Sequence, residues 1–206
     1  MLNRRLVSLL AAVSVAGLAA TGCAEQSAAI RVDDATVSRR DFEDQLDYVY
    51  EHDDFRNLLF PGVTQDQLRA DDDPPGTYRQ EYVGALAGVQ VQFLVVDRLL
   101  RDHGIEVSDD HREAIVAELD QLPGGTDAVP DDMREQYVDG FAGFETLRDE
   151  LAEEELDAAL QEVIDGSTIE VSPRYGSWDS DQFTVVPPPG PAGAPGAAEA
   201  TGAPTG

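Results

Sequence analysis

The sequence predicts a mainly α-helical domain: an irregular helical bundle with a small β element and a disordered Pro/Gly/Ala tail. Apolar residues recur at helical spacing over most of residues 38–165. Short β-like runs lie near the two ends of the ordered region, at 30–37 and 168–171. From residue 187 onward the composition changes to Pro, Gly, Ala and Thr, which cannot bury enough apolar surface to offset the entropy of ordering.

The first 22 residues have the layout of a secretory signal peptide. Arg4 and Arg5 precede an uncharged apolar stretch at 6–20, and small residues follow it. The apolar stretch has about 15 residues, fewer than the ~20 that a membrane-spanning helix needs. We therefore expect residues 1–22 to be removed and the mature chain to begin at Cys23.

Cys23 is the only cysteine, and small residues lead to it. This arrangement resembles the lipobox of bacterial lipoproteins, in which the cysteine sulfur carries a diacylglycerol, although Ala20 stands where that family usually has Leu, Val or Ile. The resemblance implies that Cys23 is lipidated and that 23–29 is a short tether to the membrane. An ordinary signal peptide beside an incidental cysteine is the alternative. One helical domain at 30–186 and a disordered tail at 187–206 are expected to follow.

The domain begins with two short β-like runs at 30–32 and 35–37. A helix over about 38–52 is predicted next, because Ser38 is a good N-cap and apolar residues recur at helical spacing behind it. Those apolar residues are Phe42, Leu46 and Val49.

The strongest helix signal covers 77–103. Residues 53–76 before it are expected to be irregular, apart from one short helix capped by Thr64 and Gln67. The stripe of the long helix is apolar on much of its circumference, which predicts the most buried element, and Gly104 suits its C-cap. The residues of the stripe are Tyr82, Leu86, Val89, Phe93, Val96 and Leu100. Four polar residues argue against a membrane span: Gln90, Gln92, Asp97 and Arg98.

The remaining elements are predicted from caps and spacing. Ser108 begins a helix, with acidic residues in its first turn. A short helix is expected at 131–139, then a joint at the glycines of 140–143, then a long final helix at about 143–165. The β-like run at 168–171 could pair with the first strands and close the domain.

Charge excludes several partner classes. The formal charge is −27, with 41 acidic residues against 14 basic ones, all of which are arginine. A chain without a basic stripe does not neutralise phosphates, so we expect no nucleic-acid binding and no electrostatic adhesion to anionic lipid. We interpret the carboxylates as a solvated surface that keeps the protein soluble.

Catalytic and metal-binding motifs are not found in the sequence. The three histidines, His52, His103 and His111, lack metal-site spacing and are expected at the surface. There is no nucleophile elbow, phosphate loop or dinucleotide fingerprint. The acidic run at 71–73 lacks the spacing of an EF-hand. We therefore expect no enzyme, no cofactor and no metal.

Several stretches together resemble the N-terminal helical domain of the SurA/PrsA-type periplasmic foldases. They are the strand-to-helix passage at 30–42, the turn at 104–109 after a buried helix, and the returning helix at 143–160. Residues 174–179 resemble a C-terminal element of lipoprotein members. The resemblance covers about residues 30–180.

This resemblance implies a holdase or foldase module that binds unfolded or exported polypeptides at the extracytoplasmic face of the cell membrane. The parvulin isomerase domain that these foldases often carry needs ~90–100 residues. The chain has no room for it, so we expect no isomerase activity. The candidate client-binding residues are Phe55, Phe60, Tyr137, Phe141 and Trp178.

Three alternatives stay open. These aromatic residues could simply complete the core, with Trp178 as a structural latch. The chain could be a peptidyl-prolyl isomerase-related enzyme with a minimal site. It could also be an acidic assembly or adaptor protein of the envelope, which pairs its carboxylates with a basic partner.

Overall fold

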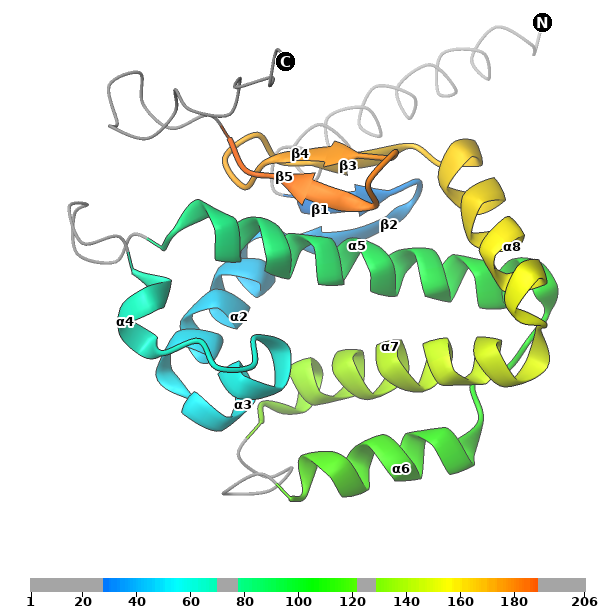
Figure 1. Ribbon diagram of the computed structural model, residues 1–206, viewed down its shortest axis with the longest axis horizontal. Coiled ribbons are helices and arrows are strands. Elements are labelled where there is room, and N and C mark those ends of the chain that lie inside the picture. Colours follow the sequence, from blue (N-terminus) through cyan, green and yellow to red (C-terminus); the bar gives the residue numbers. More distant parts are fainter. Residues whose placement is uncertain (1–27, 70–77, 122–128, 189–206) are drawn as a thin grey trace, which may run out of the picture.

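The computed structural model describes residues 28–69, 78–121 and 129–188. The described part is mainly helical, with a few short antiparallel strands, as the sequence predicts. Figure 1 shows the long helix α5 through the middle of the molecule, two small sheets on one side of it, and α7 and then α6 on the other. Cys23, the signal peptide and the tail beyond residue 188 lie outside the described residues.

The first sheet joins the two ends of the described domain. It consists of β1 (Ala28–Val32), β2 (Ala35–Ser38) and β3 (Ile169–Val171) in the order β2-β1-β3, and both pairings are antiparallel. The predicted pairing of the N-terminal and C-terminal runs is therefore confirmed. β1 begins at Ala28, so it includes two residues that the sequence assigns to the tether.

Asp33 lies in the turn between β1 and β2 and connects this turn to the chain before β3. Its φ is +53°, a left-handed conformation that Asp tolerates better than most residues. The backbone N–H of Asp33 donates to the carbonyl oxygen of Thr168 at 2.9 Å, and the N–H of Thr168 donates to Asp33 Oδ1 at 2.9 Å. Two hydrogen bonds thus hold the hairpin turn against the chain that enters β3.

A second sheet, which the sequence analysis did not predict, is a hairpin of β4 (Ser177–Asp179) and β5 (Thr184–Val186). Its strands have three residues each, too few for a periodic signal. Gly176 precedes β4 with a φ of +137°, and a Cβ there would lie 2.5 Å from the carbonyl oxygen of Val186. Only glycine fits that approach.

The first helices largely follow their predicted caps. α2 (Arg39–Glu51) begins where the Ser38 hydroxyl accepts the N–H of Asp41 at 3.1 Å. The short helix α4 (Gln65–Leu68) begins with the expected capping box of Thr64 and Gln67.

Residues 53–59 were expected to be irregular, and that expectation was wrong. They form the helix α3 (Asp53–Leu59), which has acidic residues in its first turn and buries Phe55. Acidic side chains favour a helix N-terminus, and tertiary burial of one face supplies the stability that a seven-residue helix lacks alone.

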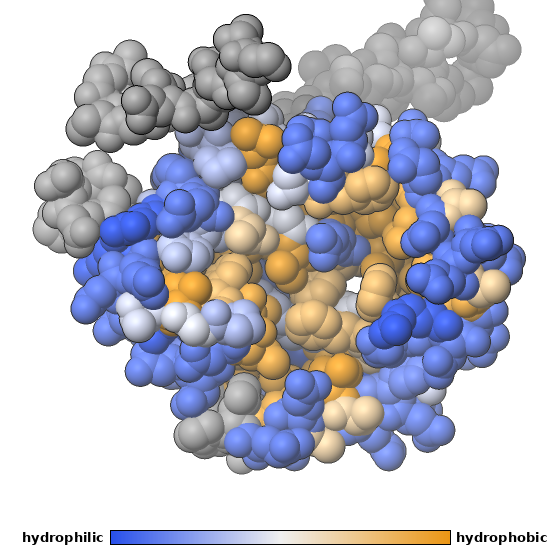
Figure 2. Space-filling model, in the orientation of Figure 1, coloured by the Kyte–Doolittle hydropathy of each residue, from blue (hydrophilic) through white to orange (hydrophobic). Residues whose placement is uncertain are grey.

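α5 (Gln80–His103) is the central helix, and Gly104 ends it in the left-handed conformation with a φ of +64°. The helix is long and apolar enough to cross a membrane, but 67% of its most apolar window is buried inside the protein. Its apolar character therefore serves the core of the domain. The outward faces of the surrounding helices are mostly hydrophilic (Figure 2).

α6 (Asp109–Leu119), α7 (Asp131–Glu150) and α8 (Glu153–Gly166) complete the helices. The expected joint at Gly140 and Gly143 was wrong, because α7 runs through both glycines and the chain breaks only after Glu150. Both glycines instead allow α5 to approach closely. A Cβ on Gly140 would lie 2.4 Å from the Phe93 ring, and one on Gly143 would lie 3.0 Å from Leu100.

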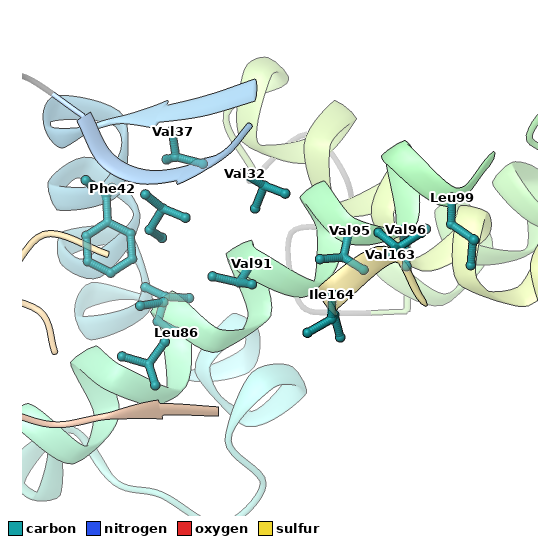
Figure 3. Close-up of a cluster of buried hydrophobic side chains, with 14 of the residues drawn as sticks. Val32, Val37, Phe42, Leu86, Val91, Val95, Val96, Leu99, Val163 and Ile164 are labelled. Atoms are coloured by element: carbon teal, nitrogen blue, oxygen red, sulfur yellow. The ribbon is translucent and has the colours of Figure 1, made fainter. Parts of the chain in front are cut away.

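The main core lies between α5 and the elements on its sheet side (Figure 3). Side chains of α5 meet Val32 and Val37 of the first hairpin, Phe42 of α2, and Val163 and Ile164 of α8. The α5 side chains labelled in Figure 3 are Leu86, Val91, Val95, Val96 and Leu99. The opposite face of α5 packs toward α3 and α7.

Candidate functional site

Four of the five predicted client-binding residues gather in one aromatic cluster. Phe55 of α3 packs edge-on against Tyr137 of α7, with ring centroids 5.1 Å apart, and Tyr137 lies 6.1 Å from Phe141. Phe93 of α5 contacts both α7 rings, at 5.4 Å and 5.1 Å. Phe60, at the C-terminal end of α3, borders the cluster. We call these residues, with the apolar side chains packed on them, the aromatic cluster.

Burial divides the cluster into an inner and an outer part. Phe55 is 2% exposed and Tyr137 is fully buried, so these two complete the core, as in the alternative stated above. Phe60 and Phe141 are partly exposed. Only these two of the four candidates are accessible to a partner without a change in the fold.

Phe144 extends the outer part and was not predicted. It is 39% exposed, and with Tyr137 and Phe141 it follows the spacing i, i+4, i+7 along α7. The sequence contains this helical spacing. The expected joint at 140–143 nevertheless placed Tyr137 and Phe144 in two different helices, so a shared face was not predicted. Figure 2 shows apolar side chains gathered over α3, α5 and α7, where this face of the molecule is hollowed. We call this surface the apolar face; of the two helices that carry the exposed aromatic residues, α3 ends at Phe60 and α7 includes Phe141 and Phe144.

Trp178 lies elsewhere. It belongs to β4 and packs, partly buried, against the main core on the sheet side of α5. It lines a pocket of about 610 Å³ beside β1 and β3. The structure therefore separates Trp178 from the other four candidates, in a position that fits the latch described above.

A chain of glutamine side chains crosses the interior behind the aromatic cluster. Gln45 of α2 donates from Nε2 to Gln136 Oε1 of α7 at 2.8 Å, and Gln136 Nε2 donates to Gln90 Oε1 of α5. Gln90 is fully buried and Gln45 is 3% exposed. Gln45 Oε1 and Gln90 Nε2 are buried without hydrogen-bond partners. Isolated glutamines carry no signal in a sequence, so this network was not predicted.

The Tyr137 hydroxyl lies at the inner end of this network. Burial raises the pKa of Tyr137 well above its usual value, and the adjacent Gln90 side chain opposes that shift in part. The hydroxyl is buried and no partner meets hydrogen-bond geometry with it. Tyr137 is therefore a neutral phenol at pH 7.

Gln45 and Gln136 also line a pocket of about 510 Å³ between α2 and the start of α7. Its other lining includes the carboxylates of Asp41, Asp44 and Asp132. The volume is within the range typical of ligand sites, ~300–1,000 Å³.

The three histidines lie in different parts of the described domain: His52 ends α2, His103 ends α5 and His111 belongs to α6. His52 and His103 are exposed, as predicted, but His111 is half-buried between α6 and α7. His111 Nδ1 lies 3.1 Å from Thr146 Oγ1, and His111 Nε2 lies 3.1 Å from Asp149 Oδ2. The Thr146 hydroxyl donates to the Ala142 carbonyl oxygen at 2.7 Å, so His111 ties the helices together. Among residues 28–69, 78–121 and 129–188, no group of three or more His, Cys, Asp or Glu side chains could hold a metal ion.

The described residues thus offer two candidate binding surfaces, the apolar face and the polar α2–α7 pocket. No family model matches the chain, and no curated protein or solved structure matches it either.

Proposed function

We propose that this chain is a lipoprotein, anchored through Cys23 at the extracytoplasmic face of the cell membrane, whose helical domain binds unfolded or exported polypeptides. In this proposal the protein acts as a holdase or foldase, without isomerase activity. The resemblance to SurA/PrsA-type foldases supports it, as does the pairing of β1 with β3 around a helical bundle.

The observation that carries the proposal is the apolar face. The surface of this acidic protein is largely hydrophilic, yet apolar side chains gather over α3, α5 and α7 on the face drawn in Figure 2, and Phe60 at the end of α3 and Phe141 and Phe144 on α7 are partly exposed. Contiguous exposed apolar surface in a soluble domain is typical of interaction sites. Burying one Phe side chain contributes about 1.5–3 kcal/mol, which suits weak and reversible holding of an apolar segment.

The position of the sheet supports the anchored form. Only residues 24–27 separate Cys23 from β1, and four extended residues span about 14 Å. A lipid on Cys23 would keep the domain beside the bilayer, where exported chains emerge.

Aggregation of a chemically unfolded client, followed by light scattering, tests the proposal. Residues 24–206 should suppress it at a few-fold molar excess, and Phe144→Asp should weaken the suppression. Phe183→Asp is the matched control, because Phe183 is 38% exposed against 39% for Phe144 but lies in the β4–β5 turn. No suppression at several-fold excess, or equal effects of the two variants, would contradict the proposal.

A prolyl-peptide isomerisation assay distinguishes the proposed function from the isomerase alternative. In the proposed function the chain leaves the uncatalysed time of tens to hundreds of seconds unchanged. A concentration-dependent acceleration would favour an enzyme instead.

A further inference from the structure

One end of the apolar face lies where the end of α3 meets the start of α5. Phe60 packs edge-on against Tyr82 of α5, with ring centroids 5.8 Å apart, and both rings are partly exposed. Tyr82, Val89 and Phe93 follow the spacing i, i+7, i+11, so one stripe of α5 continues from this pair into the aromatic cluster. A partner that reaches Tyr82 therefore reaches the apolar face.

The described part of the chain ends on the other side of the same helix. β5 packs on α5, where a Cβ on Gly84 would lie 3.0 Å from the carbonyl oxygen of Val185 and 3.6 Å from Cγ of Pro187. Gly84 is two residues from Tyr82, so the two lie on opposite sides of α5 at nearly the same height. Half the circumference of a helix with its side chains is roughly 20 Å. The chain beyond Pro188 therefore starts roughly 20 Å from Tyr82.

Residues 189–206, which we call the tail segment, have a composition that suits this site. Four of the five residues 187–191 are proline, and such runs favour the extended polyproline II conformation. Proline-rich segments bind grooves lined with aromatic side chains, because their bound conformation is already favoured before binding. Glu199 is the only charged residue of the tail segment, although the whole chain carries a formal charge of −27. The acidic domain therefore repels this segment little, whereas it repels acidic polypeptides.

The tail segment is also long enough to reach the site. In the polyproline II conformation, residues 189–206 span about 56 Å, against roughly 20 Å around α5. A segment attached this closely has an effective concentration on the order of 2 mM at the site. Contacts with a Kd of about 1 mM then keep the site covered for about two-thirds of the time. A weak interaction is therefore sufficient, and it leaves the site open to a client.

We propose that the tail segment covers the Phe60–Tyr82 end of the apolar face and competes there with client polypeptides. Its proline-rich part passes around α5, and its proline rings pack on the two aromatic side chains. Client binding is weakened about threefold when the site is free for about one-third of the time. The covered state also keeps this apolar surface from other molecules when no client is present. The inference rests on the proposed function and adds its regulation.

A spin label on the tail segment tests this contact in residues 24–206, which contain all the described residues. They include no cysteine, so Ala194→Cys places a nitroxide label at one site. The methyl signals of Val63 and Val89, which pack in the aromatic cluster, should be strongly broadened by the label. Addition of an unfolded client should restore these signals, because the client displaces the tail segment.

A proline-free variant shows whether the contact depends on the prolines. Pro189→Ser, Pro191→Ser and Pro195→Ser together keep the length and charge of the tail segment but remove three proline rings and their conformational preference. In the labelled chain, this triple variant should regain most of the intensity of the Val63 and Val89 signals. Without the label, it should suppress client aggregation at about threefold lower concentration than the parent.

Two single variants locate the contact on the domain. Phe60→Ala should restore the broadened signals, whereas Phe183→Ala should leave them broadened. Phe183 is the matched control, because it is an exposed aromatic residue, at 38%, that lies in the β4–β5 turn close to the start of the tail segment. Equal effects of the two variants would contradict the assigned site.

The outcomes separate the inference from the proposed function. Sharp Val63 and Val89 signals, or equal broadening with and without the three prolines, overturn the inference and leave client binding standing. Broadening that persists beside a client whose aggregation is suppressed contradicts the competition. If the broadening depends on the prolines but neither chain suppresses client aggregation, the tail contact is supported and the proposed function is contradicted.

Discussion

Replacement of Gly140 by alanine should destabilise the domain, although alanine is the better helix former. Gly140 lies inside α7, and an added Cβ would lie 2.4 Å, 2.6 Å and 2.7 Å from Cδ1, Cγ and Cε1 of Phe93. Atoms near the root of a ring cannot move aside as the end of a flexible side chain does. Phe93 is also held by Tyr137 and Phe141, with ring centroids 5.4 Å and 5.1 Å away.

The magnitude follows from two opposing effects. Alanine in place of glycine stabilises a helix by about 1 kcal/mol. Overpacking of a well-filled site costs about 1–3 kcal/mol, and the upper half of that range applies when the clash is with a ring confined on two edges. We therefore expect a net loss of roughly 1–2 kcal/mol in the free energy of unfolding, or a fall in Tm of about 2–8 °C at this chain length.

Urea denaturation of residues 24–206, followed by circular dichroism, measures this change. Gly166→Ala is the control, because Gly166 ends α8 and an added Cβ meets nothing within 4 Å there. It should be neutral or stabilising, by up to about 1 kcal/mol. Phe93→Leu should offset part of the Gly140→Ala loss in a double-mutant cycle. A Gly140→Ala protein as stable as the parent would refute the close contact between α5 and α7.

Two further predictions concern the anchor and the response to alkali. Cys23→Ser should move the protein from the membrane fraction to the soluble fraction of cells, and a variant that stays membrane-bound would contradict lipidation. Burial, together with the hydrogen bond to Glu43, raises the pKa of Tyr175 from 10.0 to about 12. A pKa raised in the folded state gives stability that is complete below pH 10 and is lost as the pH rises toward 12. The urea midpoint should fall over that interval, and less in Tyr175→Phe than in the parent.

The sequence predicts those elements whose local signals agree with their packing. The caps at Ser38, Thr64 and Gly104 begin or end helices as expected, because a capping side chain or a left-handed glycine acts within a few residues. The pairing of β1 and β3 was predictable because both runs lie at the ends of one helical region.

Elements decided by tertiary contacts were not predictable in the same way. Gly140 and Gly143 favour a break by propensity, but the close approach of α5 requires small residues and keeps α7 continuous. The sequence gives no sign that Phe55 and Tyr137 are less accessible than Phe60 and Phe141. Only the packing of α3 against α7 buries the first pair. The glutamine network joins residues that are 91 and 46 positions apart, so no local pattern reveals it.

The position of β1 in the middle of the first sheet has a consequence for the order of folding. Its partner β3 is made more than 130 residues later, so one edge of β1 has no strand beside it until residue 171 is available. A chain that crosses a membrane N-terminus first would expose this open edge throughout its passage, and open edges invite pairing with other chains. Completion of the fold must therefore wait until nearly the whole domain is available, and a chain shortened before β3 should aggregate rather than fold.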